Sequence, residues 1–246
     1  MISAIKIIFL LGFLVFIHEL GHFVVAKLCK VKIKEFSIGF GPSIYTKKGS
    51  YTIYSLRLIP LGGYVNMLGE EEDVDDEGSF KRAKIWKRII IVAAGGLVNI
   101  IFAIFVYFLL VYGTLKGLHS QGILQLSISA VGEFVSQIFN SLKLIFTGGV
   151  SIDQFVGPVG ISEIIVSSTG ISDYIYLFSA ISLSLGITNL LPFPPLDGGR
   201  IILLLIEKIR KKPLSDSVEG KIQLLGFSLL ILLSICVTYN DIIRLL

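Results

Sequence analysis

The sequence predicts a polytopic α-helical membrane protein, with four transmembrane helices and a membrane-associated β-hairpin or small sheet between the first and second. The 246 residues are 53% hydrophobic and only 16% charged, and their mean hydropathy is +0.81. The hydrophobic content and hydropathy lie far above those of soluble domains, and the charged fraction lies below. Four separate stretches reach the roughly 20 apolar residues that cross a bilayer. A soluble protein with four buried helices would need a larger polar shell than these loops supply.

The predicted spans cover residues 5–28, 89–112, 174–196 and 222–239, and the last three contain no charged residue. The first could be mistaken for a signal peptide. Its apolar part is longer than that of a signal peptide, however, and no A-x-A cleavage site follows it. We therefore expect it to span the membrane.

The distribution of Lys and Arg predicts the orientation of the spans. Of the 22 basic residues, 12 lie between residues 27 and 88 and six between residues 200 and 221, whereas the 113–173 loop has only Lys116 and Lys143. By the positive-inside rule, the first and third loops face the cytoplasm, and the 113–173 loop and both termini lie outside. Basic residues in such places contact anionic lipid, so nucleic-acid binding is not expected.

Residues 31–66 predict the β-hairpin or small sheet. Apolar residues alternate with small ones over 36–40, a second alternating run covers 51–58, and residues 47–49 supply a turn between them. Because the segment is apolar for a loop, we expect it to dip into the bilayer edge or to pack on the spans.

Two further loops have recognisable patterns. The acidic run Glu70–Gly78 predicts a solvated loop. A calcium site is the alternative, but the D-x-D-x-D-G spacing is absent. The outer loop, 113–173, contains the amphipathic stretch Val131–Phe146, which predicts a helix on the outer surface.

The first span carries His18, Glu19 and His22 in an otherwise apolar stretch, FLVFIHELGHFVVAKL. On an α-helix the two histidines lie four residues apart on one face, so their imidazoles can bind one metal ion. With Glu19 they form the H-E-x-x-H pattern of zinc peptidases. In such sites zinc keeps one position for water and lowers its pKa towards 7, and the glutamate takes the proton.

The alternative is that packing satisfies both histidines and that Glu19 follows by chance. The location argues against this, because an acidic residue near the centre of a span costs about 3 kcal/mol. Ionisable residues inside a membrane are functional candidates by default. The sequence therefore predicts a metal site in the first span.

A third metal ligand is expected from Asp197, in the motif NLLPFPPLDGGR of residues 189–200. The only other histidine, His119, lies in the outer loop at the wrong end of the spans. The first and third spans both run inward, so Asp197 lies at the depth of His18. The prolines break the helix before Asp197, and the two glycines after it let backbone come close. The alternative is an aspartate that ends a helix in a turn.

These motifs resemble the site-2 protease family of intramembrane zinc metalloproteases, and they are most similar to the group of the bacterial regulator of sigma-E protease. Besides HELGH and NLLPFPPLDGG, the segments IGFGP (38–42), PLGGYV (60–65), AAGGLVN (93–99) and GPVGI (157–161) occur in the family's order. The resemblance implies that His18, His22 and Asp197 bind zinc and that Glu19 is the catalytic base. It also implies that Asn189 contacts the substrate or the oxyanion, a role that suits an amide donor.

The resemblance further implies an endopeptidase of regulated intramembrane proteolysis, in a bacterial inner membrane, with its active site towards the cytoplasm. The expected substrates are single-span membrane proteins such as anti-sigma factors, or signal-peptide remnants. A transmembrane helix hides its carbonyl groups in hydrogen bonds, so the substrate must unwind before cleavage. The edge of the hairpin, at the strand 51–58, could then pair with the extended substrate.

Two features depart from the family pattern. Gly96 stands where relatives commonly have proline. In addition, only about sixty residues separate the second and third spans, whereas relatives carry one or two PDZ domains there. We therefore expect a single domain over residues 1–246 without a PDZ domain.

Two other functions could use the same residues. A zinc or proton transporter could use the same ligands, but transporters usually contain internal repeats, and none is visible in this sequence. A transporter also has no need of a glutamate directly after the first histidine. An inactive scaffold could keep the metal site, but the intact Glu19 argues against it.

The orientation can be tested by cysteine labelling in intact cells. A cysteine introduced at position 117 is expected to be modified from outside, and one at Lys211 is expected to be spared, because the basic loops stay inside. The reverse pattern would overturn both the orientation and the depth argument for Asp197.

Overall fold

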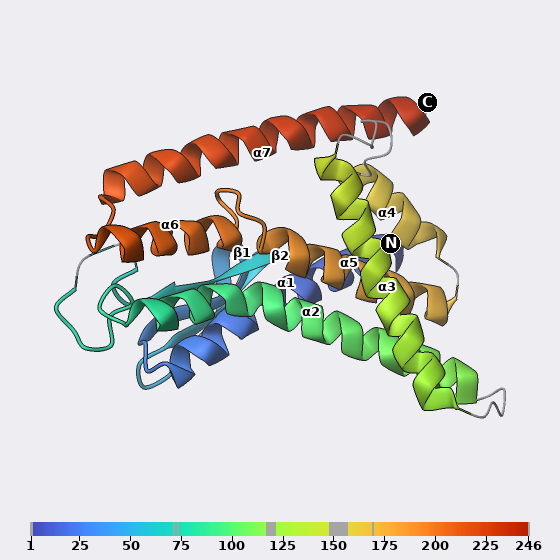
Figure 1. Cartoon of the computed structure of the whole chain (residues 1–246), viewed down its shortest axis with the longest axis horizontal. Helices are drawn as coiled ribbons and strands as arrows, with labels where there is room; N and C mark the ends of the chain where they lie inside the picture. Colours follow the sequence, from blue (N-terminus) through green and yellow to red (C-terminus); the bar gives the residue numbers. More distant parts are fainter. Residues whose placement is uncertain are drawn as a thin grey trace. The chain divides into compact units, whose positions relative to one another are not determined.

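The computed structural model of the chain describes residues 2–70, 72, 74–116, 122–147, 157–168 and 170–245. Figure 1 shows the elements in chain order: α1 (Ile2–Leu28), β1 (Ile33–Lys48), β2 (Ile53–Met67), α2 (Ile85–Lys116), α3 (Ile123–Phe146), α4 (Pro158–Ser167), α5 (Ile171–Asn189), α6 (Asp197–Arg210) and α7 (Asp216–Leu245). The predicted fold class, a mostly helical chain with a small sheet after the first span, is confirmed. Of the two labelling positions, Lys211 is exposed, and residue 117 lies outside the described residues.

Four of the described helices contain segments long and apolar enough to cross a membrane, as predicted: Ile5–Leu28, Ile85–Lys116, Ile171–Asn189 and Ser217–Ile243. Their surfaces also suit lipid. On α2, Ile101, Phe105 and Leu109 form an exposed apolar stripe at helical spacing. Water would oppose the exposure of such a stripe, whereas hydrocarbon does not. The chain is therefore a membrane-integral protein.

The third span is shorter than predicted, because α5 ends at Asn189 and not at residue 196. Pro192 has no backbone N–H, and its ring disfavours helical backbone at the preceding residue. A short turn follows, in which the Leu196 N–H donates to the Phe193 carbonyl at 2.9 Å. The chain then enters α6, a helix that the sequence pattern did not predict.

The chain divides into two compact units. One consists of Met1–Ile7, Ile100–Ser184 and Ser228–Leu246, and the other of Ile8–Asn99 and Leu185–Phe227. All five predicted site residues belong to the second unit, which also contains the sheet.

In the first unit, aromatic side chains join α2, α3 and α5. The rings of Tyr107 and Phe134 stack with their centroids 4.3 Å apart, and Tyr176 packs on both. The predicted amphipathic helix of the outer loop is α3, but it begins at Ile123 and not at Val131.

The buried carboxylate of Asp241 on α7 holds the start of α4 in the same unit. It accepts hydrogen bonds from the backbone N–H groups of Gly157 and Gly160, at 3.2 and 2.9 Å. These N–H groups lie at the helix N-terminus and have no acceptor within the helix, so an anion stabilises them.

In the second unit, β1 and β2 form a two-stranded antiparallel sheet in which both strands bend. Residues 35–38 pair with 63–66 on one side and with 53–56 on the other, and 53–56 pair in turn with 45–48. The bend of β1 uses Gly39, whose φ of +88° favours glycine. The outer segments of the sheet are therefore 63–66 and 45–48.

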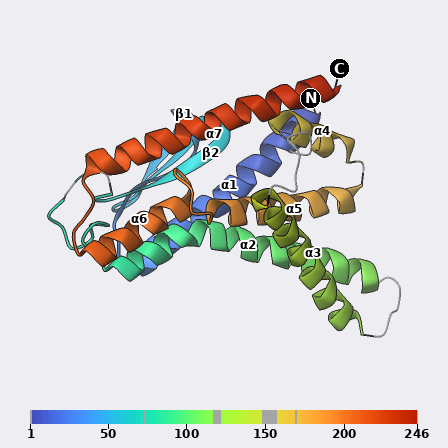
Figure 2. The same ribbon diagram turned by 45° about the horizontal axis from the view of Figure 1, so that its top comes forward.

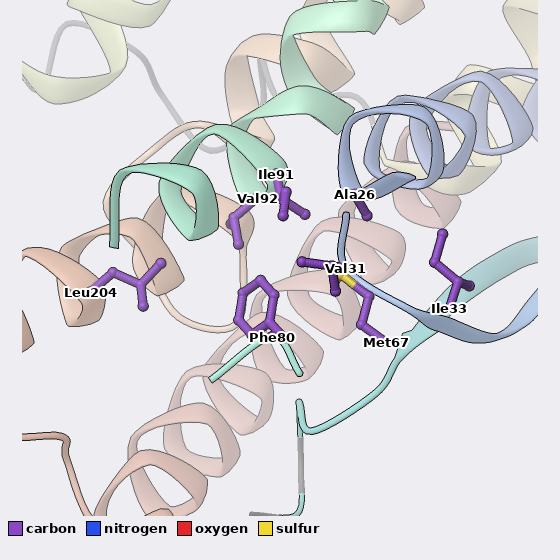
Figure 3. Close-up of a cluster of buried hydrophobic side chains, with 8 residues drawn as sticks. All are labelled: Ala26, Val31, Ile33, Met67, Phe80, Ile91, Val92 and Leu204. Atoms are coloured by element: carbon purple, nitrogen blue, oxygen red, sulfur yellow. The ribbon is translucent and has the colours of Figure 1, made fainter. Parts of the chain in front are cut away.

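The sheet packs on α1 and leads into a shared hydrophobic core. Figure 2 shows the two strands beside α1. Phe23 of α1 lies 4.8 Å from Phe36 and 6.0 Å from Tyr54 between ring centroids. The core beside it contains eight buried side chains from α1, the sheet, α2, α6 and the two loops that precede β1 and α2 (Figure 3), namely Ala26, Val31, Ile33, Met67, Phe80, Ile91, Val92 and Leu204. Burial of each large side chain contributes about 1.5–3 kcal/mol, so this core holds together the elements that carry the predicted site.

Candidate metal centre

The structure brings His18, His22 and Asp197 together at one point. The Nε2 atoms of the two histidines are 3.2 Å apart, and Asp197 Oδ2 lies 3.2 Å from the first and 3.3 Å from the second. Donor atoms held at about 2.0–2.1 Å from a tetrahedral zinc would be about 3.4 Å apart. Among the described residues, these three form a group that could hold a metal ion. Two imidazole nitrogens and one carboxylate oxygen fit zinc and leave one coordination position open.

A backbone carbonyl of α2 orients one of the two imidazoles. His22 Nδ1 lies 2.8 Å from the carbonyl oxygen of Ile91. A carbonyl can only accept, so Nδ1 carries the proton, and the lone pair of Nε2 faces Asp197 and His18. Such a partner fixes the tautomer of a metal-binding histidine and raises its basicity.

Gly95 of α2 makes room for both imidazoles. A Cβ at this position would lie 2.3 Å from His22 Nε2 and 2.7 Å from His18 Cε1. Any side chain would therefore occupy the space of the metal-facing nitrogens. Gly95 was not predicted as a site residue, although it lies in the AAGGLVN segment, because its role depends on how closely α1 and α2 pack.

The glycines after Asp197 let α6 begin close to the broken end of α5. A Cβ at Gly198 would lie 2.2 Å from the carbonyl oxygen of Leu191, and one at Gly199 would lie 2.7 Å from that of Phe193. This fold-back places Asp197, the first residue of α6, against the two histidines. Burial alone would raise the pKa of the Asp197 carboxyl, but the hydrogen bonds and charges of His18 and His22 lower it below its usual value. The carboxylate is therefore ionised, as metal binding requires.

Glu19 and the edge of the sheet line the same cavity as the metal-facing residues. The cavity has a volume of about 480 Å³ and is lined by His18, Glu19, His22, Tyr64, Val65, Asn66, Met67, Glu70, Val92, Asp197 and Arg200. Its wall on the sheet side is the outer segment of β2. A Cβ at Gly63 would lie 3.2 Å from Glu19 Cγ, so this segment passes directly beside the Glu19 side chain.

Two sequence expectations fall elsewhere. Asn189 ends α5 and is half-buried, and it is not among the described residues that line the cavity. His119, which the sequence excluded as a ligand, lies outside the described residues.

The prediction of a solvated acidic loop is wrong for its first residue, Glu70. Its side chain is only 13% exposed, and its Oε1 accepts a hydrogen bond from Arg200 Nη2 at 2.6 Å. Burial lowers the pKa of Arg200, but the charge and hydrogen bond of Glu70 outweigh burial and raise it above its usual value. The one available signal was position: Glu70 follows the sheet directly, and Arg200 follows Asp197 by about one helical turn.

A helix that can span a membrane, a buried H-E-x-x-H pair and a carboxylate from a later helix together define a membrane-integral zinc peptidase. The comparison with protein families agrees with this class. The profile of Peptidase family M50 matches residues 6–233, and the chain belongs to this family. It is a zinc-dependent hydrolase of peptide bonds.

Relatives that match almost the whole chain carry corresponding names. The chain is 25% identical to the regulator of sigma-W protease RasP of Bacillus subtilis, with 99% of each chain covered. It is 24% identical to the zinc metalloprotease RasP of Bacillus licheniformis, again over 99% of each chain. The B. subtilis alignment extends over 418 positions, so that relative has additional residues within the matched region.

Metal analysis tests the three ligands. We expect about one zinc per chain in the wild type and loss of the metal in His18→Ala and in Asp197→Ala, because two remaining ligands bind zinc weakly. Inductively coupled plasma mass spectrometry of the purified chain measures the content. Full zinc occupancy in Asp197→Ala would show that the third ligand is another group.

Substitution of Gly95 tests the packing around the imidazoles. Gly95→Ala is expected to lower zinc affinity, since its Cβ would lie 2.3 Å from His22 Nε2. Gly113→Ala on the same helix is the matched control, because its added Cβ would meet no atom within 4 Å. Alanine also favours a helix over glycine by up to about 1 kcal/mol. Equal zinc affinity in both variants would contradict the close fit.

Proposed function

We propose that this chain is an intramembrane endopeptidase that cleaves transmembrane segments of single-span proteins in regulated intramembrane proteolysis. The observation that carries the proposal is the position of the metal centre. His18 and His22 lie on a helix that can span the membrane, and Asp197 meets them from α6. A soluble substrate has no need of a peptidase whose reactive groups lie at such a place.

In this proposal His18, His22 and Asp197 hold zinc and Glu19 is the general base. Bound zinc would polarise the scissile carbonyl group and lower the pKa of water. Glu19 lies in the same cavity, where its carboxylate takes a proton from the attacking water and then donates it to the leaving amine. The carbonyl of Ile91 holds the proton of His22 on Nδ1 throughout.

The sheet supports a way of holding an unwound substrate. The expectation that strand 51–58 offers an edge is wrong over residues 53–56, because these pair on both sides. The outer segment 63–66 pairs with 35–38 on one side, and residues 64–67 line the cavity. An extended substrate that adds to this segment would gain the backbone hydrogen bonds it lost on unwinding.

The class of substrate is supported by one relative. The B. subtilis relative is named regulator of sigma-W protease RasP. Anti-sigma factors anchored by a single span suit the proposed site. Signal-peptide remnants have the same chemistry, a short apolar helix, and are the second candidate.

We also propose a bacterial inner-membrane location, with both termini outside and the metal centre towards the cytoplasm. The Lys and Arg residues around the first and third loops support this orientation. The relatives named above are bacterial. For Asn189, we propose a contact with the substrate, supported by its place at the broken end of α5.

The Glu19→Gln variant should lose catalysis but keep metal binding. Glutamine keeps the shape and the hydrogen bonding of glutamate but cannot accept the proton. We expect full zinc content and a loss of cleavage of at least about 10²-fold, measured by co-expression with a single-span substrate and mass spectrometry of the fragments. Turnover like that of the wild type would refute the role of Glu19.

Substitutions at the sheet edge and at Asn189 should weaken the holding of the substrate without affecting metal binding. Successive N–H groups of a strand point to opposite sides, so one of Val65→Pro and Asn66→Pro removes a donor that faces the substrate. We expect that variant, and Asn189→Ala, to cleave more slowly with zinc content unchanged; one lost hydrogen bond of about 1 kcal/mol corresponds to roughly fivefold.

A substrate with a helix-destabilising residue near the scissile bond should recover part of this loss, because less unwinding is needed. If both proline variants cleave stable and destabilised substrates normally, strand addition at this edge is excluded.

A further inference from the structure

The ion pair between Glu70 and Arg200 joins the sheet edge to the helix that carries Asp197. Arg200 Nη2 donates to Glu70 Oε1 at 2.6 Å, and Glu70 Oε2 accepts from the backbone N–H of Met67 at 3.3 Å. Met67 is the last residue of β2. A continuous set of contacts therefore runs from Met67, which follows outer segment 63–66, to the first turn of α6.

Both ends of this connection are anchored. The Arg200 N–H donates to the Leu196 carbonyl at 3.2 Å, which closes the first turn of α6 around Asp197. On the other side, the Leu68 N–H donates to the Lys32 carbonyl at 2.8 Å, directly before the Glu70 turn. The ion pair thus joins two backbone segments that are each held by other hydrogen bonds. It can therefore fix the distance between these two segments.

The pair also faces the reacting groups. Glu70 and Arg200 line the cavity of His18, Glu19 and Asp197, and they also line a neighbouring cavity of about 530 Å³. A short charge-assisted hydrogen bond of this kind restricts geometry more than a neutral one does. Either charge left alone at this partly buried place would be costly, so the two side chains depend on each other.

We propose that Glu70 and Arg200 are positioning residues of the peptidase: their ion pair sets the separation between outer segment 63–66 of the sheet and Asp197, and so places the scissile bond of an added substrate strand at the metal centre. The proposal rests on the proposed function. Loss of the pair leaves the metal ligands and the strand edge intact but misplaces one relative to the other. A misplacement of about 1 Å can lower the rate about 10²-fold.

A matched ion pair allows a sharp control. Arg88 Nη1 and Glu207 Oε1 are also 2.6 Å apart, and this pair, which is also largely shielded from solvent, joins α2 to α6. Arg88 and Glu207 line the neighbouring cavity, and they are not among the described residues that line the cavity of the metal-facing residues. Loss of this control pair removes the same kind of interaction without touching the proposed geometry.

The experiment compares Glu70→Gln, Arg200→Gln and Glu207→Gln in the purified full chain. The probe is a synthetic single-span peptide with a fluorophore and a quencher on either side of a helix-destabilising Gly-Pro pair. Kinetics, zinc content and Tm are measured for each variant. We expect Glu70→Gln and Arg200→Gln to lower kcat by about 10- to 100-fold with little change in KM or zinc content. Glu207→Gln should change Tm with kcat preserved.

Glu70→Arg and Arg200→Glu, each made alone, place two like charges together and should lower kcat. The double variant, which carries both substitutions and restores opposite charges, should recover part of that kcat. If Arg200→Gln does not fold, Arg200→Lys makes the same comparison, since it keeps the charge and loses the planar fork. Unchanged kcat in the pair variants, or an equal loss in Glu207→Gln, would overturn the positioning role. A wild-type chain that cleaves no probe would instead contradict the proposed function.

Discussion

The placement of His18, Glu19 and His22 within a helix that can span the membrane is the constraint on which the rest of the second unit depends. Hydrocarbon offers no hydrogen bonds, so each of these groups needs a partner from the protein or from a bound ion. The structure supplies a carbonyl from α2 to His22 and a carboxylate from α6 to both histidines. Segments far apart in the sequence must therefore meet at this point.

Close approach of backbone to side chain makes this meeting possible. Glycine at position 95 lets α2 pass directly behind the imidazoles, and Gly198 and Gly199 let α6 begin against the end of α5. The prolines after Asn189 have a different effect, because they end the third span early. The next helix, α6, then begins at Asp197, whose carboxylate faces the two histidines.

A small sheet beside these helices adds what a helical bundle lacks. A helix satisfies its own backbone, whereas the outer segment of a sheet keeps donors and acceptors for another chain. Here that segment, 63–66, lies beside Glu19, and its end is joined to α6 through Glu70 and Arg200. The residues proposed for proton transfer, metal binding and substrate holding therefore line one cavity.

The sequence by itself determined the existence of four spans and of the sheet, the H-E-x-x-H pair and the candidacy of Asp197 as third ligand, because each is expressed in local composition, in helical spacing or in the order of prolines and glycines. Only the tertiary structure decided that the edge beside the site is 63–66 and not 51–58, that Gly95 cradles the imidazoles, and that Glu70 pairs with Arg200. The reason is physical. The pairing of strands and the distance between helices depend on which distant surfaces pack together. The local sequence pattern of the residues involved does not depend on these distant partners, so it cannot reveal them.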